Sequence, residues 1–141
     1  MISEESANPD PVELVRRPVE AGNHRDWDAV LAFWGPDPVW DMSPMGMSVH
    51  EGAAAIRGFF EDWVAAYEEF EMQAEEVLDL SNGVTFGVFV QRGRPIGSSG
   101  EVTVRYGAVG VWDGAFQSRA TNYADVDEAR AAAERLAQER G

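Results

Sequence analysis

The chain has no cysteine and only two histidines, His24 and His50, among its 141 residues. Without thiols it can form no disulfide, no thiolate nucleophile and no metal site with cysteine ligands. Two histidines leave little for a metal site of another kind. We therefore expect no metal ion and no cofactor.

Basic residues are also scarce. The 11 Lys and Arg residues stand against 25 Asp and Glu residues, which gives a formal net charge of −14. Such a chain is repelled by phosphate backbones and by anionic lipid, so we expect neither nucleic acid nor a membrane as a partner. An anionic substrate would need a local basic pocket.

Long apolar runs and targeting signals are missing as well. No apolar stretch approaches the roughly 18 residues of a membrane span. The first residues, MISEESANPD, have neither the basic start nor the apolar stretch of a signal peptide. Together with the absence of cysteine, this favours a cytoplasmic protein.

Apolar residues make up 45% of the chain, enough for one hydrophobic core, and the length leaves no room for a second full domain. Residues 1–9 are polar, and we expect them to be disordered or frayed. Residues 10–141 are expected to form a single domain.

The N-terminal half has helical patterns. A first helix begins at Asp10 as N-cap with Pro11 at the first helical position, and Pro18 should kink or shorten it. A second helix lies between a cap at Asp26 and a stop at Gly35-Pro36. Its apolar residues keep a spacing of three and four: Trp27, Val30, Leu31 and Trp34.

A third helix is expected within residues 52–70. Its apolar stripe consists of Ile56, Phe59, Phe60, Trp63 and Tyr67. A short strand at 39–43 precedes it. Period-2 alternation then predicts an antiparallel meander of strands within 70–80, 83–93, 100–112 and 116–124. A last helix starts at Asp125, so the fold class is α+β.

Three segments occur in an order that resembles a known family: ELVRRPVEAGNHRDWDAVLAFWGPDPVW, HEGAAAIRGFFEDW and SRATNYADVDEA. With the motifs from Gly52 to Phe60 and from Arg119 to Asp125, the chain resembles the SnoaL-like branch of the nuclear transport factor 2-like superfamily. The resemblance implies a cone: a strongly curved, mostly antiparallel sheet wrapped on about three N-terminal helices, plus a C-terminal helix. It also implies a pocket inside the cone and a homodimer through the sheet face.

The reaction is not fixed by this resemblance, because the superfamily includes ketosteroid isomerase, limonene epoxide hydrolase, scytalone dehydratase, polyketide cyclases and proteins with no known activity. One hypothesis is a protein that binds a small apolar, oxygen-bearing molecule and acts on it by cofactor-free acid/base chemistry. The reaction would be isomerisation, cyclisation, dehydration or epoxide hydrolysis. The alternative is a non-catalytic ligand-binding or dimeric interaction module.

Asp41 is the main catalytic candidate, because its place resembles that of the proton-abstracting aspartate of ketosteroid isomerase. Burial in an apolar pocket would raise its pKa toward neutral, as a general base needs. A register shifted by one residue would instead turn Trp40 inward. Asp41 could also hydrogen-bond the following loop or pair with an arginine.

Arg119 and Tyr123 are four residues apart on one expected strand and therefore share a face. By resemblance that face points into the pocket, where both would donate hydrogen bonds to a substrate oxygen or an oxyanion. A structural role is the alternative for each. Pro18 and Ala108 fall near the oxyanion donors of ketosteroid isomerase, which argues against its steroid isomerisation.

An Asp–Arg pair would also fit limonene epoxide hydrolase, in which carboxylates flank an arginine. The second carboxylate of that arrangement has no counterpart that we can identify in this sequence.

His50, in the loop before the third helix, is a further candidate at the pocket mouth. The expected apolar lining of the pocket is aromatic, although most aromatic residues at these spacings serve the core. The candidates are Trp40, Phe59, Trp63, Phe86, Tyr106 and Trp112.

Overall fold

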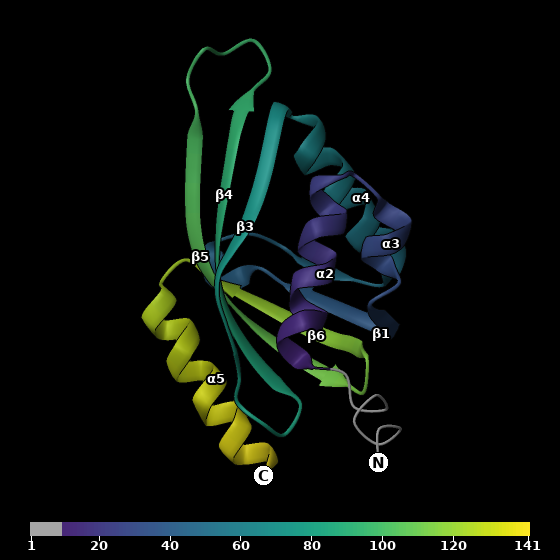
Figure 1. Cartoon of the computed structure of the whole chain (residues 1–141), viewed down its shortest axis with the longest axis vertical. Helices are drawn as coiled ribbons and strands as arrows, with labels where there is room; N and C mark the ends of the chain where they lie inside the picture. The colour runs from purple at the N-terminus through teal and green to yellow at the C-terminus, as the bar shows by residue number, and fades with distance from the viewer. Residues whose placement is uncertain (1–9) are drawn as a thin grey trace.

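A computed structural model describes residues 10–141, in which four helices accompany a curved sheet of six strands (Figure 1). The residues expected to be frayed, 1–9, lie outside this range. The elements are α2 (Pro11–Asn23), α3 (Trp27–Leu31), β1 (Trp34–Asp41), the 3₁₀ turn η1 (Ser43–Met45), β2 (Val49–Glu51), α4 (Ala53–Ala65), β3 (Tyr67–Asp79), β4 (Val84–Pro95), β5 (Val102–Asp113), β6 (Phe116–Tyr123) and α5 (Val126–Arg140).

The strands lie side by side in the order β2-β1-β6-β5-β4-β3. Every neighbouring pair is antiparallel except β1 and β6, which run parallel. This confirms the expected α+β class with a mostly antiparallel sheet. None of the helices described is long and apolar enough to cross a bilayer.

The predicted helix starts are confirmed. The Asp10 side chain accepts a hydrogen bond from the backbone N–H of Val12 at 3.0 Å, and Asp125 caps α5 in the same way. Pro18 does not shorten α2, which continues to Asn23. A proline inside a helix removes one backbone hydrogen bond, and packing against the sheet compensates for such a loss.

Three boundaries differ from the prediction, and at two of them, Trp34 and Tyr67, strand pairing outweighs the local helical pattern. Trp34 does not end the second helix; it starts β1 and pairs with Gln117 of β6. Tyr67 likewise starts β3 instead of ending α4. Strand β1 ends at Asp41, so Ser43 belongs to the following 3₁₀ turn.

The end of α2 is attached to the open edge of the sheet. The Asn23 side chain donates to the carbonyl of Met72 at 2.8 Å and accepts from the N–H of Met72 at 2.7 Å. Met72 lies on β3, the edge strand. The amide therefore pairs with the strand backbone as a neighbouring strand would.

The two faces of the sheet have different partners, as Figure 1 shows. Helices α2, α3 and α4 lie against one face, here called the inner face. Helix α5 packs on the opposite, outer face, where its Ala129 and Ala133 contact Phe86 and other apolar residues of β4 and β5. Gly107 allows this close approach, since a Cβ at that position would lie 2.5 Å from the Cβ of Ala129.

We predict that Gly107→Ala destabilises the fold by about 1–3 kcal/mol, because the added methyl group overpacks the contact between α5 and the sheet. Gly58→Ala, inside α4, is the matched control. No atom lies within 4 Å of the new methyl group there, so the higher helix propensity of alanine should stabilise the chain by about 0.5–1 kcal/mol. Urea unfolding measures both; equal effects would contradict the packing argument.

Candidate functional site

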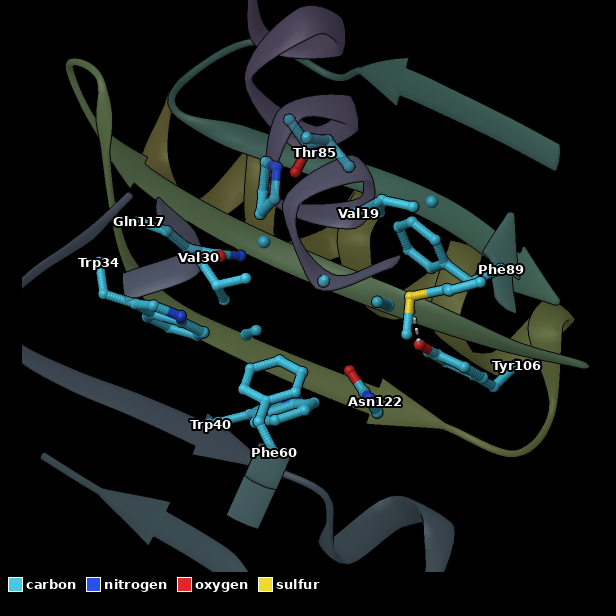
Figure 2. Close-up of a pocket in the computed structure, with 18 of the residues that line it drawn as sticks. Val19, Val30, Trp34, Trp40, Phe60, Thr85, Phe89, Tyr106, Gln117 and Asn122 are labelled. Atoms are coloured by element: carbon cyan, nitrogen blue, oxygen red, sulfur yellow. Dashed lines mark hydrogen bonds between the residues drawn. The ribbon is translucent and has the colours of Figure 1, made fainter. Parts of the chain in front are cut away.

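A cavity of about 120 Å³ lies between the N-terminal helices and the inner face of the sheet (Figure 2). Apolar side chains of α2 and α3, among them Val19 and Val30, form one wall. Trp34, Trp40 and Phe60 form another. For comparison, a cavity of roughly 150 Å³ between apolar side chains holds benzene.

The aromatic wall is held rigidly by ring contacts. The ring centroids of Trp40 and Phe60 are 4.6 Å apart, and Trp27 stacks on Phe60 at 5.7 Å with an interplanar angle of 20°. Aromatic pairs at such distances contribute beyond their buried area. The cavity therefore offers a preformed surface for a planar ligand.

Four polar side chains interrupt this lining: Thr85, Tyr106, Gln117 and Asn122. Thr85 accepts a hydrogen bond from the indole N–H of Trp112 at 3.0 Å, and the Tyr106 hydroxyl donates to the sulfur of Met72 at 3.6 Å. Neither the Gln117 nor the Asn122 amide is hydrogen-bonded to another residue drawn in Figure 2. These two amides are available to a ligand.

Ionisable groups are kept out of the cavity. Of the side chains within 10–141 that line it, Tyr106 is the only one that can titrate. Burial raises the pKa of Tyr106, so its phenol remains neutral at ordinary pH. The cavity can bind through apolar contact and neutral hydrogen bonds, but the lining that residues 10–141 provide contains no carboxylate or imidazole to carry a proton.

Gln117 reaches the cavity through a β-bulge. Arg119 pairs with Val111, yet Gln117 pairs with the next residue of β5, Trp112, which leaves Ser118 as an extra residue on β6. A bulge reverses the side-chain alternation along a strand. Gln117 therefore faces inward together with Ala120 and Asn122, although its residue number is odd.

Asp41 does not face the cavity; the register shifted by one residue is the one observed, and Trp40 lines the wall. The Asp41 carboxylate accepts from the Ser43 hydroxyl at 2.6 Å, from the Ser43 N–H at 2.9 Å and from Arg119 at 2.8 Å. These bonds, the Ser43 hydroxyl first, hold the pKa of Asp41 below its ordinary value. The condition for a raised pKa, burial in an apolar pocket, is not met, and the alternative of loop and arginine partners for Asp41 is the one observed.

Arg119 and Tyr123 also lie on the outer face. Arg119 forms the ion pair with Asp41, and its side chain is 47% exposed. Tyr123 packs against the apolar cluster beneath α5. The structure thus brings Asp41 and Arg119 together, as one alternative anticipated, but on the side of the sheet opposite the cavity.

The aromatic candidates divide between several sites. Trp40, Tyr106 and Trp112 line the cavity, and Trp63 lines a smaller adjoining void. Phe59 packs on His50, with ring centroids 4.4 Å apart, away from the main cavity. Phe86 was expected in the pocket but is completely buried on the outer face against α5, because the strand alternation turns it away from Thr85.

His50 lies on β2, which pairs with β1. Its Nε2 atom is buried and has no hydrogen-bond partner within residues 10–141. The ring lies near Trp40 and Phe59. His50 is thus a neighbour of the aromatic wall and not part of the lining of the main cavity.

Several lining residues were not anticipated. Trp34 was assigned to a helix, and Thr85 carried no signal beyond its place in a strand. Strand alternation places Asn122 on the face opposite Arg119, and that face is the one toward the cavity. The bulge at Ser118 that turns Gln117 inward has no clear mark in the local sequence.

The fold agrees with what comparison with known proteins finds. The model of the SnoaL-like domain family matches residues 15–115, most of the chain. The chain therefore belongs to the SnoaL-like domain family. No functionally curated protein matches it.

Solved structures show the same fold at low identity. The protein RV0760c of Mycobacterium tuberculosis, in complex with estradiol-17beta-hemisuccinate, is 19% identical, with a TM-score of 0.71 over 84% of this chain and 97% of its own. A putative polyketide cyclase of Xanthomonas campestris is 24% identical, with a TM-score of 0.64, covering 82% of this chain and 90% of the other. A hypothetical protein of Catenulispora acidiphila with a ketosteroid isomerase-like fold, in complex with trimethylamine, is 15% identical, with a TM-score of 0.72, covering 82% and 86%.

We predict that Asp41→Asn lowers the free energy of unfolding at pH 7 by about 1–2 kcal/mol, since charged hydrogen bonds are lost. The pKa of Asp41 is lower in the folded than in the unfolded protein. The contribution of Asp41 to the free energy of unfolding is therefore complete above the unfolded pKa of about 3.9, and it is lost as the pH falls through the folded pKa. Urea unfolding of both proteins from pH 7 to pH 2.5 should show the difference disappear.

The exposed carboxylate of Asp37, on the same strand, is the control. Asp37→Asn should change the stability by less than about 0.5 kcal/mol. A difference for Asp41→Asn that grows as the pH falls would contradict the ion-pair assignment.

Proposed function

We propose that this protein binds a small, uncharged and largely apolar molecule in the cavity, without acting on it by acid/base chemistry. The observation that carries the proposal is the composition of the cavity wall. Tryptophan and aliphatic side chains surround two amides, Gln117 and Asn122, and no carboxylate or imidazole is among the lining residues described. Apolar walls with a few fixed polar groups are typical of small-molecule sites.

The position of Asp41 supports binding over catalysis. A general base must come within hydrogen-bond reach of the proton that it removes. Asp41 lies on the outer face, and its oxygens are occupied by Ser43 and Arg119. A cofactor-free isomerase, cyclase, dehydratase or epoxide hydrolase that uses this aspartate is therefore the less supported hypothesis.

The comparisons support a ligand in general terms. Two proteins of the same fold were crystallised with small molecules, one with a steroid derivative and one with trimethylamine. At 19% and 15% identity these structures share the fold alone with this chain, so they do not specify its ligand. The uncharged wall of the cavity favours a neutral molecule.

Acetophenone, a neutral aromatic ketone, is a suitable probe. We expect it to bind with a Kd on the order of 1 mM, a moderate affinity for nine heavy atoms. Benzoate, of similar size but negatively charged, should bind at least tenfold more weakly, because the wall offers no cation to compensate its desolvation. Titration followed by ¹H–¹⁵N NMR at the tryptophan indole signals measures both.

Two variants locate the binding. Ala120→Phe, at the register partner of Gly110, places a ring in the cavity and should abolish the acetophenone shifts, whereas Thr121→Val, on the outer face of β6, should retain them. The NMR spectra of both variants also report whether they fold. Equal binding of acetophenone by wild type and a folded Ala120→Phe, or no binding by wild type, would contradict the proposal.

Homodimerisation and a cytoplasmic location stay predictions. Helix α5 covers part of the sheet face through which the dimer was expected. We still expect a dimer from the family resemblance, through the part of that face that α5 leaves open. Sedimentation velocity at micromolar concentration should show a species of twice the monomer mass; a monomer alone would contradict the expectation.

A further inference from the structure

One end of the cavity gathers three polar atoms over a residue that has no side chain. A Cβ built on Gly110 would lie 2.6 Å from the Thr85 hydroxyl oxygen, 2.9 Å from the indole nitrogen of Trp112 and 3.0 Å from the side-chain nitrogen of Gln117. A side chain at position 110 would thus collide with these atoms, so the glycine lets all three approach the strand backbone, and all four residues line this end of the cavity. We name this place, formed by Thr85, Gly110, Trp112 and Gln117, the polar pocket.

The hydrogen bonds of the polar pocket leave donors unused. The indole N–H of Trp112 is donated to the Thr85 hydroxyl oxygen at 3.0 Å. An indole has one donor, so Trp112 is satisfied, whereas a hydroxyl that accepts a bond still has its own hydrogen to donate. In the part of the chain that the structure describes, residues 10–141, the Thr85 hydroxyl donates its hydrogen to no acceptor.

Gln117 adds two N–H groups beside this hydroxyl. Its backbone N–H is fixed by a 2.7 Å bond to the carbonyl of Phe33, while its side chain is free of the other residues drawn in Figure 2. Gln117 is half-buried, so water can satisfy this amide until a ligand replaces it. The bulge at Ser118 turns this amide inward, and bulges are often found where a side chain must be directed to a site.

From these donors we infer that the polar pocket recognises an acceptor oxygen of the ligand, such as a ketone carbonyl, through the Thr85 hydroxyl and the Gln117 amide. This inference rests on the proposed function and adds the chemical class of the ligand: an uncharged aromatic or alicyclic molecule with an acceptor oxygen at one end. The apolar part of the ligand then lies along Trp34, which pairs with Gln117 in the sheet and lines the cavity together with Val30.

Asn122 lies too far away to share this role for a small ligand. It pairs with Ala108 on β5, and Gln117 pairs with Trp112, four residues further along. At about 3.3 Å per residue the two amides are attached roughly 13 Å apart. A single-ring ligand reaches one of them, and the polar pocket has the second donor, Thr85, that Asn122 lacks.

The test uses two molecules of the same shape. Acetophenone has a carbonyl where α-methylstyrene has a methylene group, so they differ in the acceptor oxygen alone. We expect Gln117→Leu to weaken acetophenone binding about 3- to 10-fold and to change α-methylstyrene binding less than twofold, since one neutral hydrogen bond is lost. Thr121→Val, on the same strand but the outer face, is the control and should change neither.

A second measurement does not depend on a variant. The side-chain amide signals of Gln117 in the wild-type protein should shift further on addition of acetophenone than on addition of α-methylstyrene, because only acetophenone adds a hydrogen bond to the effect of the aromatic ring. Thr85→Val should also lower acetophenone affinity about 3- to 10-fold. Since it leaves the Trp112 indole without a partner, its fold is checked by NMR first.

The outcomes separate the two proposals. If neither molecule binds, the proposed function and this inference both fail. Suppose that both bind, that Gln117→Leu weakens them equally or not at all, and that the Gln117 amide signals respond equally to both or to neither. The recognition of an oxygen then fails, and the binding function stands. Selective loss of acetophenone together with a selective amide shift supports both.

Discussion

The alternation of side chains along the strands decides which groups of this molecule meet. Because successive residues point to opposite faces, Thr85 faces the cavity and its neighbour Phe86 faces α5. The same rule separates Asn122, which is inside, from Tyr123, which is outside. The bulge at Ser118 is the one place on β6 where the rule is interrupted, and there Gln117 joins the inner set. Core, ion pair and cavity all follow from this assignment of faces.

The sequence predicts the elements better than the site. Caps at Asp10 and Asp125, turn residues and period-2 patterns mark short-range preferences that the fold retains, so the α+β class and the order of elements are correct. Trp34 and Tyr67 were misplaced because a strand gains its hydrogen bonds from distant partners that a local helical spacing does not reveal. The alternation showed that Asp41 lies opposite Trp40, but alternation alone cannot tell which of the two faces is inward.

Charge is separated from the cavity throughout the described structure. All eleven basic residues of the chain are arginines, and several pair with carboxylates away from the cavity, as Arg105 does with Glu75 and Arg130 with Glu76. Such partly exposed pairs contribute little stability. Their arrangement keeps both signs of charge in contact with water, where the cost of desolvation is small. The cavity is left to aromatic surface and neutral hydrogen bonds, which suits a ligand without charge.

The bond between Asn23 and Met72 has a consequence for self-association. Edge strands such as β3 have unpaired backbone groups that invite another strand to join the sheet. At Met72 both of these groups are already used by a side-chain amide from a helix, which cannot extend the sheet further. The strand also carries exposed acidic residues such as Glu69 and Glu71, which would repel a second copy of the same edge. A helix that encloses the cavity thereby also protects the chain from sheet-to-sheet aggregation.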